Sequence, residues 1–241
     1  MQQQVLELSV PARCDFASFI PSTGSCSALE FARRCADPSD PEKLLYLYGP
    51  GGCGKTHLLH AIGRQVAGDG YRLFCCGEMR EEEAGTLLEE LSGLPVLLLD
   101  DLDRLPDSAA LRSVIWEAFN RQHSSGRPLA LAGRFAPREL RSLDEHLTSR
   151  LLWGLVASLE LSDDSARRML IVKLAQDRQV LLPDDVATWL LTVLPRDSEA
   201  LVAACDELYR AALATGRKIT LRLARELFLP HHNQSTGVAE S

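Results

Sequence analysis

Two patterns of apolar and polar residues divide the chain. Up to residue 161, short apolar runs alternate with longer stretches in which apolar residues recur every three or four positions. The short runs predict buried strands, and the helical periodicity predicts helices. The expected strands are residues 44–48, 71–76, 96–99, 128–132 and 155–161. The expected helices are residues 25–36, 55–67, 78–91, 108–122 and a helical segment that ends at 153. This alternation predicts an α/β fold in which helices cover both faces of a parallel sheet.

The strand pattern disappears from residue 162 onward. Helices are expected there at residues 162–177, 183–194 and 198–214, with a short fourth at 220–227. Ser162 and Pro183 are residue types that commonly begin a helix. The pattern therefore predicts four parts, which are a flexible arm (1–15), a parallel-sheet base (16–160), a small all-helical lid (161–229) and a frayed tail (230–241).

Composition and charge limit the classes of protein to which the chain can belong. The chain has 241 residues, of which 46% are hydrophobic, and a formal net charge of −7. Strong direct DNA binding needs a surplus of Lys and Arg, so this balance disfavours it. No apolar run approaches the ~18 residues that span a bilayer, and the start lacks a secretion signal, so no membrane association is expected. The seven cysteines lack metal-ligand spacing, which favours reduced thiols in the cytoplasm.

A glycine-rich motif follows the first predicted strand. It has the form G-x-x-x-x-G-K-[ST], and its residues are Gly49, Pro50, Gly51, Gly52, Cys53, Gly54, Lys55 and Thr56. The glycines let the backbone wrap an anion with its N–H groups, and the following helix adds its positive dipole end. Lys55 would reach the β- and γ-phosphates, and the Thr56 hydroxyl would bind Mg²⁺. The motif therefore predicts an ATP or ADP site with Mg²⁺.

His57 follows the motif directly and is counted with the nucleotide-binding residues. His60 lies three positions later, on the same helix face. A zinc or catalytic role for the two histidines is possible in principle, but packing explains them better. In the same way, Trp116 and Phe119 are expected in the core, and the glutamates between residues 78 and 90 on a solvated helix face.

Two aspartates follow the third predicted strand. Asp100 would hold Mg²⁺, directly or through water, and Asp101 would orient the attacking water. Aspartates after a strand are often simple helix caps. Together with the phosphate loop, however, they predict the acidic half of a nucleotide site.

Four sequence segments carry a family resemblance. GKTHLLHAI begins at Gly54, LLLDDLD at Leu97, SRLLWGL at Ser149 and PDDVA at Pro183. They resemble the bacterial DnaA-type family of AAA+ ATPases, the replication initiators, over roughly residues 16–229. The resemblance implies an AAA+ P-loop base followed by a helical lid.

Within this family, the chain resembles the regulatory inactivators of the Hda type. We expect it to lack the helix-turn-helix domain and the long amino-terminal domain of the initiator. The resemblance implies an ATP/ADP-binding regulator that docks on the DNA polymerase sliding clamp. It would then promote hydrolysis of the ATP bound to the initiator DnaA, which is negative control of replication initiation. It also implies head-to-tail assembly, so homo-oligomers are an expectation.

The clamp motif of these inactivators, Q-L-S-L-P-L, has an imperfect match in the arm. The matching residues are Leu8, Ser9, Val10 and Pro11, with Glu7 in place of the glutamine and Ala12 in place of the last leucine. Gln3 and Gln4 could serve in another register. The alternative is an arm with a few hydrophobic residues and no clamp affinity.

The resemblance also assigns an arginine finger, and the chain departs from the family pattern at two positions. Arg150 matches the finger, which would act in trans on the ATP of the initiator. Arg134 stands where the family has a sensor acid, and Glu199 where it has a phosphate-contacting lid arginine. Arg196, one helical turn earlier, is the candidate substitute. Weak intrinsic ATPase activity with intact nucleotide binding follows.

Two other functions stay open. One is a non-catalytic DnaA-like adaptor or loader, in which nucleotide only orders the fold. The other is a metabolic P-loop kinase, which the helical lid and the lack of an acceptor site disfavour. A regulator would stimulate ATP hydrolysis, whereas an adaptor would only bind. Phosphate transfer to a small molecule would reveal a kinase.

Overall fold

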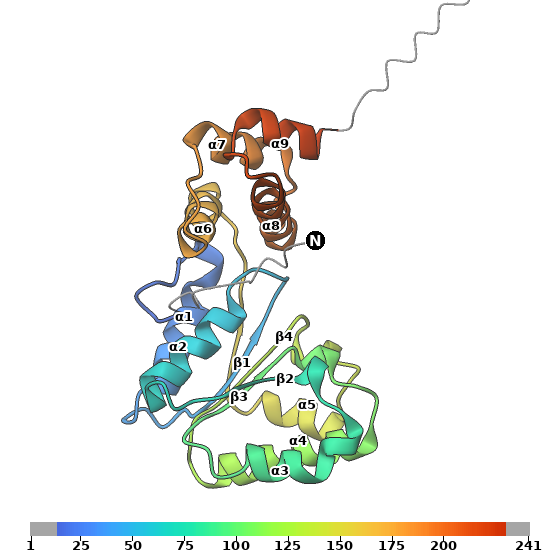
Figure 1. Cartoon of the computed structure of the whole chain (residues 1–241). Coiled ribbons are helices and arrows are strands. Elements are labelled where there is room, and N and C mark those ends of the chain that lie inside the picture. The colour runs from blue at the N-terminus through green and yellow to red at the C-terminus, as the bar shows by residue number, and fades with distance from the viewer. Residues whose placement is uncertain (1–13, 230–241) are drawn as a thin grey trace, which may run out of the picture.

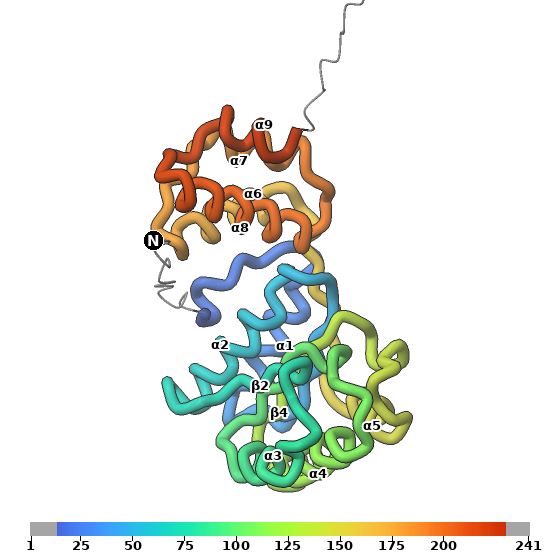
Figure 2. Tube along the Cα trace, turned by 45° about the vertical axis from the view of Figure 1, so that its right-hand side comes forward, coloured from blue at the N-terminus to red at the C-terminus, as the bar shows by residue number. Residues whose placement is uncertain are grey.

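The structure is a computed structural model, and residues 14–229 are described here. They form a base built on one sheet and, beyond it, a cluster of four helices that we call the lid (Figure 1). The chain around residues 14–25 runs between these two parts (Figure 2).

The base contains a five-stranded sheet. Its strands are β1 (Leu44–Tyr48), β2 (Leu73–Cys75), β3 (Leu97–Asp100), β4 (Leu129–Gly133) and β5 (Leu155–Ser158). The order is β2-β3-β4-β1-β5, and every neighbouring pair is parallel. Parallel pairing brings the carboxyl ends of β1, β3 and β4 to one edge. The phosphate loop, Asp100 and Arg134 therefore meet there.

Helices cover both faces of this sheet, which confirms the α/β prediction (Figure 1). One face carries α1 (Cys26–Ala36) and α2 (Lys55–Ala67), and the other carries α3 (Ala84–Leu91), α4 (Ala109–Ser124) and α5 (Glu145–Leu151). Alternate residues of a strand point to opposite faces. Accordingly, Leu45 and Leu47 enter the core under α1 and α2, whereas Leu44 and Tyr46 enter the other core. Two-sided burial explains why the strands read as continuous apolar runs.

The lid has its own apolar core. Its helices are α6 (Asp164–Asp177), α7 (Asp184–Val193), α8 (Ser198–Thr215) and α9 (Leu221–Phe228). Arg167 is buried in this unit, with 2% of its surface exposed. Its guanidinium donates to Asp164 at 3.0 Å and to the carbonyl oxygen of Pro195 at 2.9 Å, so it ties α6 to the segment before α8.

One predicted helix is interrupted in the structure. Residues 78–91 do not form a single helix, because short 3₁₀ turns at Cys76–Glu78 and Glu81–Glu83 precede α3. The backbone at Arg80 is extended, and the neighbouring Met79 enters the core. Burial of Met79 therefore overrides the local helical pattern. The glutamates of this segment are exposed, as predicted.

The segment before residue 153 is also divided. It contains a 3₁₀ turn at Pro137–Glu139 and then the short α5, which ends at Leu151. Two predicted strands are shorter than expected, since β2 spans Leu73–Cys75 and β5 ends at Ser158. These differences lie at element ends, where sequence signals are weakest.

Candidate nucleotide-binding site

The glycine-rich loop connects β1 to α2 and forms a cradle of backbone. Gly54 caps α2 with φ +106°, a left-handed conformation that disfavours other residues. A Cβ at Gly52, where φ is +72°, would lie 2.9 Å from the carbonyl oxygen of Ser198. The loop thus needs glycine both for its turns and for close approach of the lid. Its backbone N–H groups and the amino end of α2 suit an anion of phosphate type.

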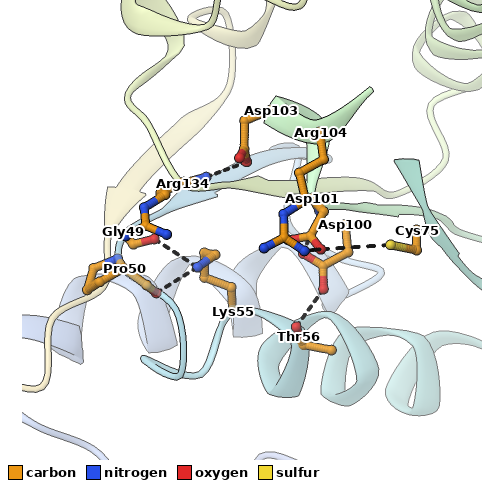
Figure 3. Close-up of polar contacts among 10 residues, drawn as sticks. All are labelled: Gly49, Pro50, Lys55, Thr56, Cys75, Asp100, Asp101, Asp103, Arg104 and Arg134. Atoms are coloured by element: carbon orange, nitrogen blue, oxygen red, sulfur yellow. Dashed lines mark hydrogen bonds and ion pairs between the residues drawn. The ribbon is translucent and has the colours of Figure 1, made fainter. Parts of the chain in front are cut away.

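Lys55 lies buried at the start of α2, with 9% of its surface exposed. Its Nζ donates to the carbonyl oxygens of Gly49 and Pro50, each at 2.8 Å (Figure 3). No ion pair between Lys55 and a carboxylate occurs within residues 14–229. A buried ammonium without a counter-ion is costly. A polyphosphate in the cradle would supply the missing negative charge.

Thr56 and Asp100 meet as the sequence predicts. The Thr56 hydroxyl donates to Asp100 Oδ2 at 2.5 Å, although the two residues are far apart in sequence (Figure 3). Asp100 is 6% exposed, and its other oxygen accepts from the backbone N–H of Asp101 at 2.8 Å. A hydroxyl and a carboxylate beside a phosphate cradle are the oxygen ligands that Mg²⁺ prefers. The donor set therefore fits Mg²⁺.

Asp101 points to neighbours other than the loop. Its backbone is left-handed, with φ 51°. Its Oδ2 accepts from Arg104 at 3.4 Å, and the Cys75 thiol lies 3.8 Å away (Figure 3). The structure thus places Asp101 next to Asp100 but pairs its carboxylate with Arg104. A water-orienting role stays a prediction.

The lid rests directly on the loop. Ser198 Oγ donates to the carbonyl oxygen of Gly51 at 2.7 Å. A Cβ at Gly51 would lie 2.9 Å from Cδ of Glu199, so this carboxylate also lies against the loop. Glu199 pairs with Arg134 at 3.0 Å. The two residues that depart from the family pattern are therefore partners, which sequence reasoning missed. In the sequence, only the opposite charges of the two side chains could have indicated that they pair.

The structure does not bring Arg196 to the loop. Asp197 caps α8, so Arg196 lies outside the helix and does not share a helical face with Glu199. The expectation that Arg196 and Glu199 share a helix face is therefore wrong, and a contact between Arg196 and phosphate stays a prediction. Arg196 instead pairs with Asp164 at 3.1 Å, and its side chain is 79% exposed.

His57 and Cys53 have mainly structural contacts. His57 Nε2 lies 2.9 Å from the carbonyl oxygen of Asp15, and its ring meets Phe19 edge-on. Burial lowers the pKa of His57, so the neutral imidazole is favoured. Burial also raises the pKa of the Cys53 thiol, which keeps it protonated inside the loop. His57 therefore anchors the chain beside the cradle, and Cys53 packs in the core under α1 and α2.

Arg150 lies apart from the cradle, on the last turn of α5. Its guanidinium carbon is 4.2 Å from the ring centroid of Trp116 and 4.9 Å from that of Trp153. We call these three residues the arginine cage. Trp153 is 60% exposed. Trp116 is half-buried, so the prediction of a core residue holds only in part. Among the described ion pairs and hydrogen bonds, none involves the Arg150 guanidinium.

Some predictions fall outside the described residues or concern metals and membranes. The proposed clamp-binding residues Leu8, Ser9, Val10 and Pro11 lie outside residues 14–229. Within that range, no group of three or more His, Cys, Asp or Glu side chains could hold a metal ion. The described helices include none that is long and apolar enough to cross a bilayer.

Comparisons with known families agree with this geometry. The family model "Bacterial DnaA ATPase domain" matches residues 10–158, and the model "Hda, lid domain" matches residues 163–228. The chain is 27% identical to the chromosomal replication initiator DnaA of Pelobacter propionicus over 93% of its length. It is 29% identical to that of Geobacter metallireducens over 83%. The chain spans about half the length of these relatives, 53% and 47%.

Solved structures show the same fold. Domain III of DnaA from Thermotoga maritima is 25% identical, with a TM-score of 0.74 over 90% of this chain and 97% of that chain. AMPPCP-bound DnaA from Aquifex aeolicus is 22% identical, with a TM-score of 0.68 over 85% of this chain and 66% of that chain. A RuvB structure from Thermotoga maritima is 17% identical, with a TM-score of 0.63 over 89% and 71%. The base and lid thus have the AAA+ architecture.

Proposed function

The chain belongs to the bacterial DnaA ATPase-domain family, and on that premise we propose that it is an AAA+ regulator of chromosomal replication initiation. It binds ATP or ADP in its own cradle and acts in trans on the ATP bound to the initiator DnaA. The match of residues 163–228 to the Hda lid model supports an inactivator rather than an initiator. Hydrolysis of initiator-bound ATP would then limit initiation.

The proposed nucleotide role rests on the cradle. Lys55 would exchange the carbonyl oxygens of Gly49 and Pro50 for phosphate oxygens. Thr56 and Asp100 would hold Mg²⁺, which neutralises charge on the phosphates. DnaA from Aquifex aeolicus has been solved with AMPPCP, an ATP analogue, which supports an adenine nucleotide here.

The arginine cage is the observation that carries the trans activity. The Trp116 and Trp153 rings lie within cation–π distance of Arg150, while its N–H edges are free to bind an anion. Such fingers contribute roughly 10³–10⁵ in rate when they reach the terminal phosphate of a neighbouring site. A partly exposed guanidinium that forms no ion pair within residues 14–229 fits this role better than a structural salt bridge does.

The proposed clamp contact uses the arm. Leu8 and Pro11 are apolar residues that the clamp would bind, and docking would raise the local concentration of the regulator at replicating DNA. The prediction is that deletion of residues 1–12 removes clamp-dependent stimulation but preserves nucleotide binding. Binding of the full chain and the deletion variant to immobilised clamp measures the contact.

Hydrolysis of initiator-bound ATP tests the proposed function. The purified chain, with ADP and DNA-loaded clamp, should accelerate conversion of labelled ATP to ADP on DnaA. Arg150→Ala should reduce this acceleration at least about 10³-fold, to the unstimulated rate. Arg138→Ala is the matched control, because Arg138 is exposed on the base and outside the cage. Equal stimulation by the wild-type chain and Arg150→Ala would refute the finger.

A non-catalytic adaptor is the second candidate. It is favoured by the Arg134–Glu199 pair, which occupies two positions that the family uses to sense phosphate. An adaptor would bind nucleotide and clamp but leave the hydrolysis rate on DnaA unchanged. The same assay therefore separates the two functions.

A further inference from the structure

The Arg134–Glu199 pair joins the base to the lid over the phosphate loop. Arg134 follows β4, and its backbone N–H donates to Asp103 Oδ1 at 2.7 Å. Figure 3 shows its side chain directed toward Gly49 and Lys55. Backbone anchoring at Asp103 therefore fixes the point from which the side chain extends to Glu199 beside the cradle.

Glu199 approaches the loop from the lid. It lies in the first turn of α8, where the helix dipole stabilises a carboxylate. Its Cδ is 2.9 Å from the position of a Cβ on Gly51. The 3.0 Å contact with Arg134 is partly open to solvent, since the two side chains are 49% and 46% exposed. A ligand entering the cradle can therefore compete for either group.

We propose that Arg134 supplies the cation for the terminal phosphate of a nucleoside triphosphate, and that Glu199 competes with this phosphate for Arg134. The cation thus comes from strand β4 of the base, whereas the resemblance implies a lid arginine. The lid provides the anion instead, so the polarity of the base–lid contact is reversed. This inference rests on the proposed nucleotide binding and identifies the residues that discriminate between triphosphate and diphosphate.

The proposal predicts opposite effects for the two neutral variants. Glu199→Gln frees Arg134 and removes a negative charge near the terminal phosphate, so AMPPCP should bind about fivefold more tightly. Arg134→Gln removes the cation, so AMPPCP should bind about tenfold more weakly. ADP ends before the terminal phosphate and should change less than twofold in both variants. The ratio of the two affinities is therefore the diagnostic quantity.

Isothermal titration calorimetry of the full chain with Mg²⁺ and either ADP or AMPPCP measures this ratio. Glu207→Gln is the control for Glu199→Gln, because Glu207 is exposed on the same helix. Arg222→Gln is the control for Arg134→Gln, because Arg222 is exposed and pairs with Glu226 within the lid helix α9. Both controls should keep the wild-type ratio. Thermal unfolding without nucleotide checks that each variant is folded.

The exchanged variant Arg134→Glu/Glu199→Arg adds a second test. It restores the pair with its charges reversed and gives the lid the cation, so AMPPCP should bind within about threefold of the wild type. Arg134→Glu alone should bind it at least about thirtyfold more weakly.

Equal shifts for ADP and AMPPCP in Glu199→Gln and Arg134→Gln would overturn the proposal, and so would no shift in either. A wild-type chain that binds neither nucleotide would instead refute the proposed function itself. A chain that binds both with an unchanged ratio in every variant would refute only the role of the pair.

Discussion

Replacing a tryptophan of the arginine cage tests how the chain orients Arg150. Leucine keeps an apolar side chain but has no aromatic ring, so Trp153→Leu and Trp116→Leu each remove one cation–π contact. The distances from Cζ to the ring centroids are 4.9 Å for Trp153 and 4.2 Å for Trp116. Such a contact contributes about 0.5–1 kcal/mol at an exposed site and about 2 kcal/mol when desolvated. Trp153 is 60% exposed and belongs near the lower value, whereas the half-buried Trp116 belongs between the two.

These energies convert directly into rates if the cage holds Arg150 in its productive orientation. Since about 1.4 kcal/mol is tenfold, Trp153→Leu should slow stimulated hydrolysis about two- to fivefold and Trp116→Leu about five- to thirtyfold. The assay is turnover of labelled ATP on DnaA at saturating regulator. Trp153→Phe keeps a ring and should recover part of the loss. Trp189→Leu, in the lid helix α7, is the control and should leave the rate unchanged.

A spectroscopic measurement separates orientation from simple loss of folding. The chain has three tryptophans, so Trp189→Phe leaves only the two of the cage as emitters. Adding Arg150→Ala to this variant should change the emission, because it removes the cation next to both rings. If Trp116→Leu stimulates hydrolysis at the wild-type rate while Arg150→Ala is inactive, the cage does not orient Arg150.

Two further predictions concern stability. Arg167→Ala should lower the free energy of unfolding by about 2–4 kcal/mol in urea denaturation, because it removes a buried stem and two charge-assisted hydrogen bonds. Arg168→Ala, which removes a partly exposed ion pair with Asp184, should cost less than about 1 kcal/mol. Equal losses in the two variants would contradict the anchoring role of Arg167. Burial lowers the pKa of His60 below its ordinary value of 6.5, so the unfolded chain takes up its proton first and stability falls as the pH drops below about 6.5. Between pH 7 and pH 5, His60→Gln should make the free energy of unfolding depend less steeply on pH, by up to the slope that the uptake of one proton gives. Urea denaturation across this pH range measures the slope, and an unchanged slope would contradict the role of His60.

The sequence predicted the elements whose signals are local. The apolar run 44–48 became β1 because both faces of that strand are buried. Helix α2 spans Lys55–Ala67, the predicted range, because a phosphate loop precedes it and Gly68 ends it. The Thr56–Asp100 contact also followed from sequence, since parallel strands place their carboxyl ends at one edge.

Features that depend on distant contacts were not predictable. The break before α3 follows from burial of Met79, and no local residue signals it. The Arg134–Glu199 pair requires the lid to be docked on the base, so neither residue alone reveals its partner. Arg196 does not share a helix face with Glu199, because Asp197 caps α8 and the helix begins after Arg196. Sequence periodicity does not fix such a boundary to within one residue.

The proposed function depends on nucleotide binding through Lys55. Isothermal titration calorimetry of the wild-type chain and Lys55→Ala with ADP and Mg²⁺ tests it most directly, with the exposed lid residue Lys218→Ala as control. We expect binding by the wild type and Lys218→Ala, and at least about tenfold weaker binding by Lys55→Ala, since a buried charged donor is lost. Equal affinity of Lys55→Ala and the wild type, or no heat from either with ADP and ATP, would contradict it.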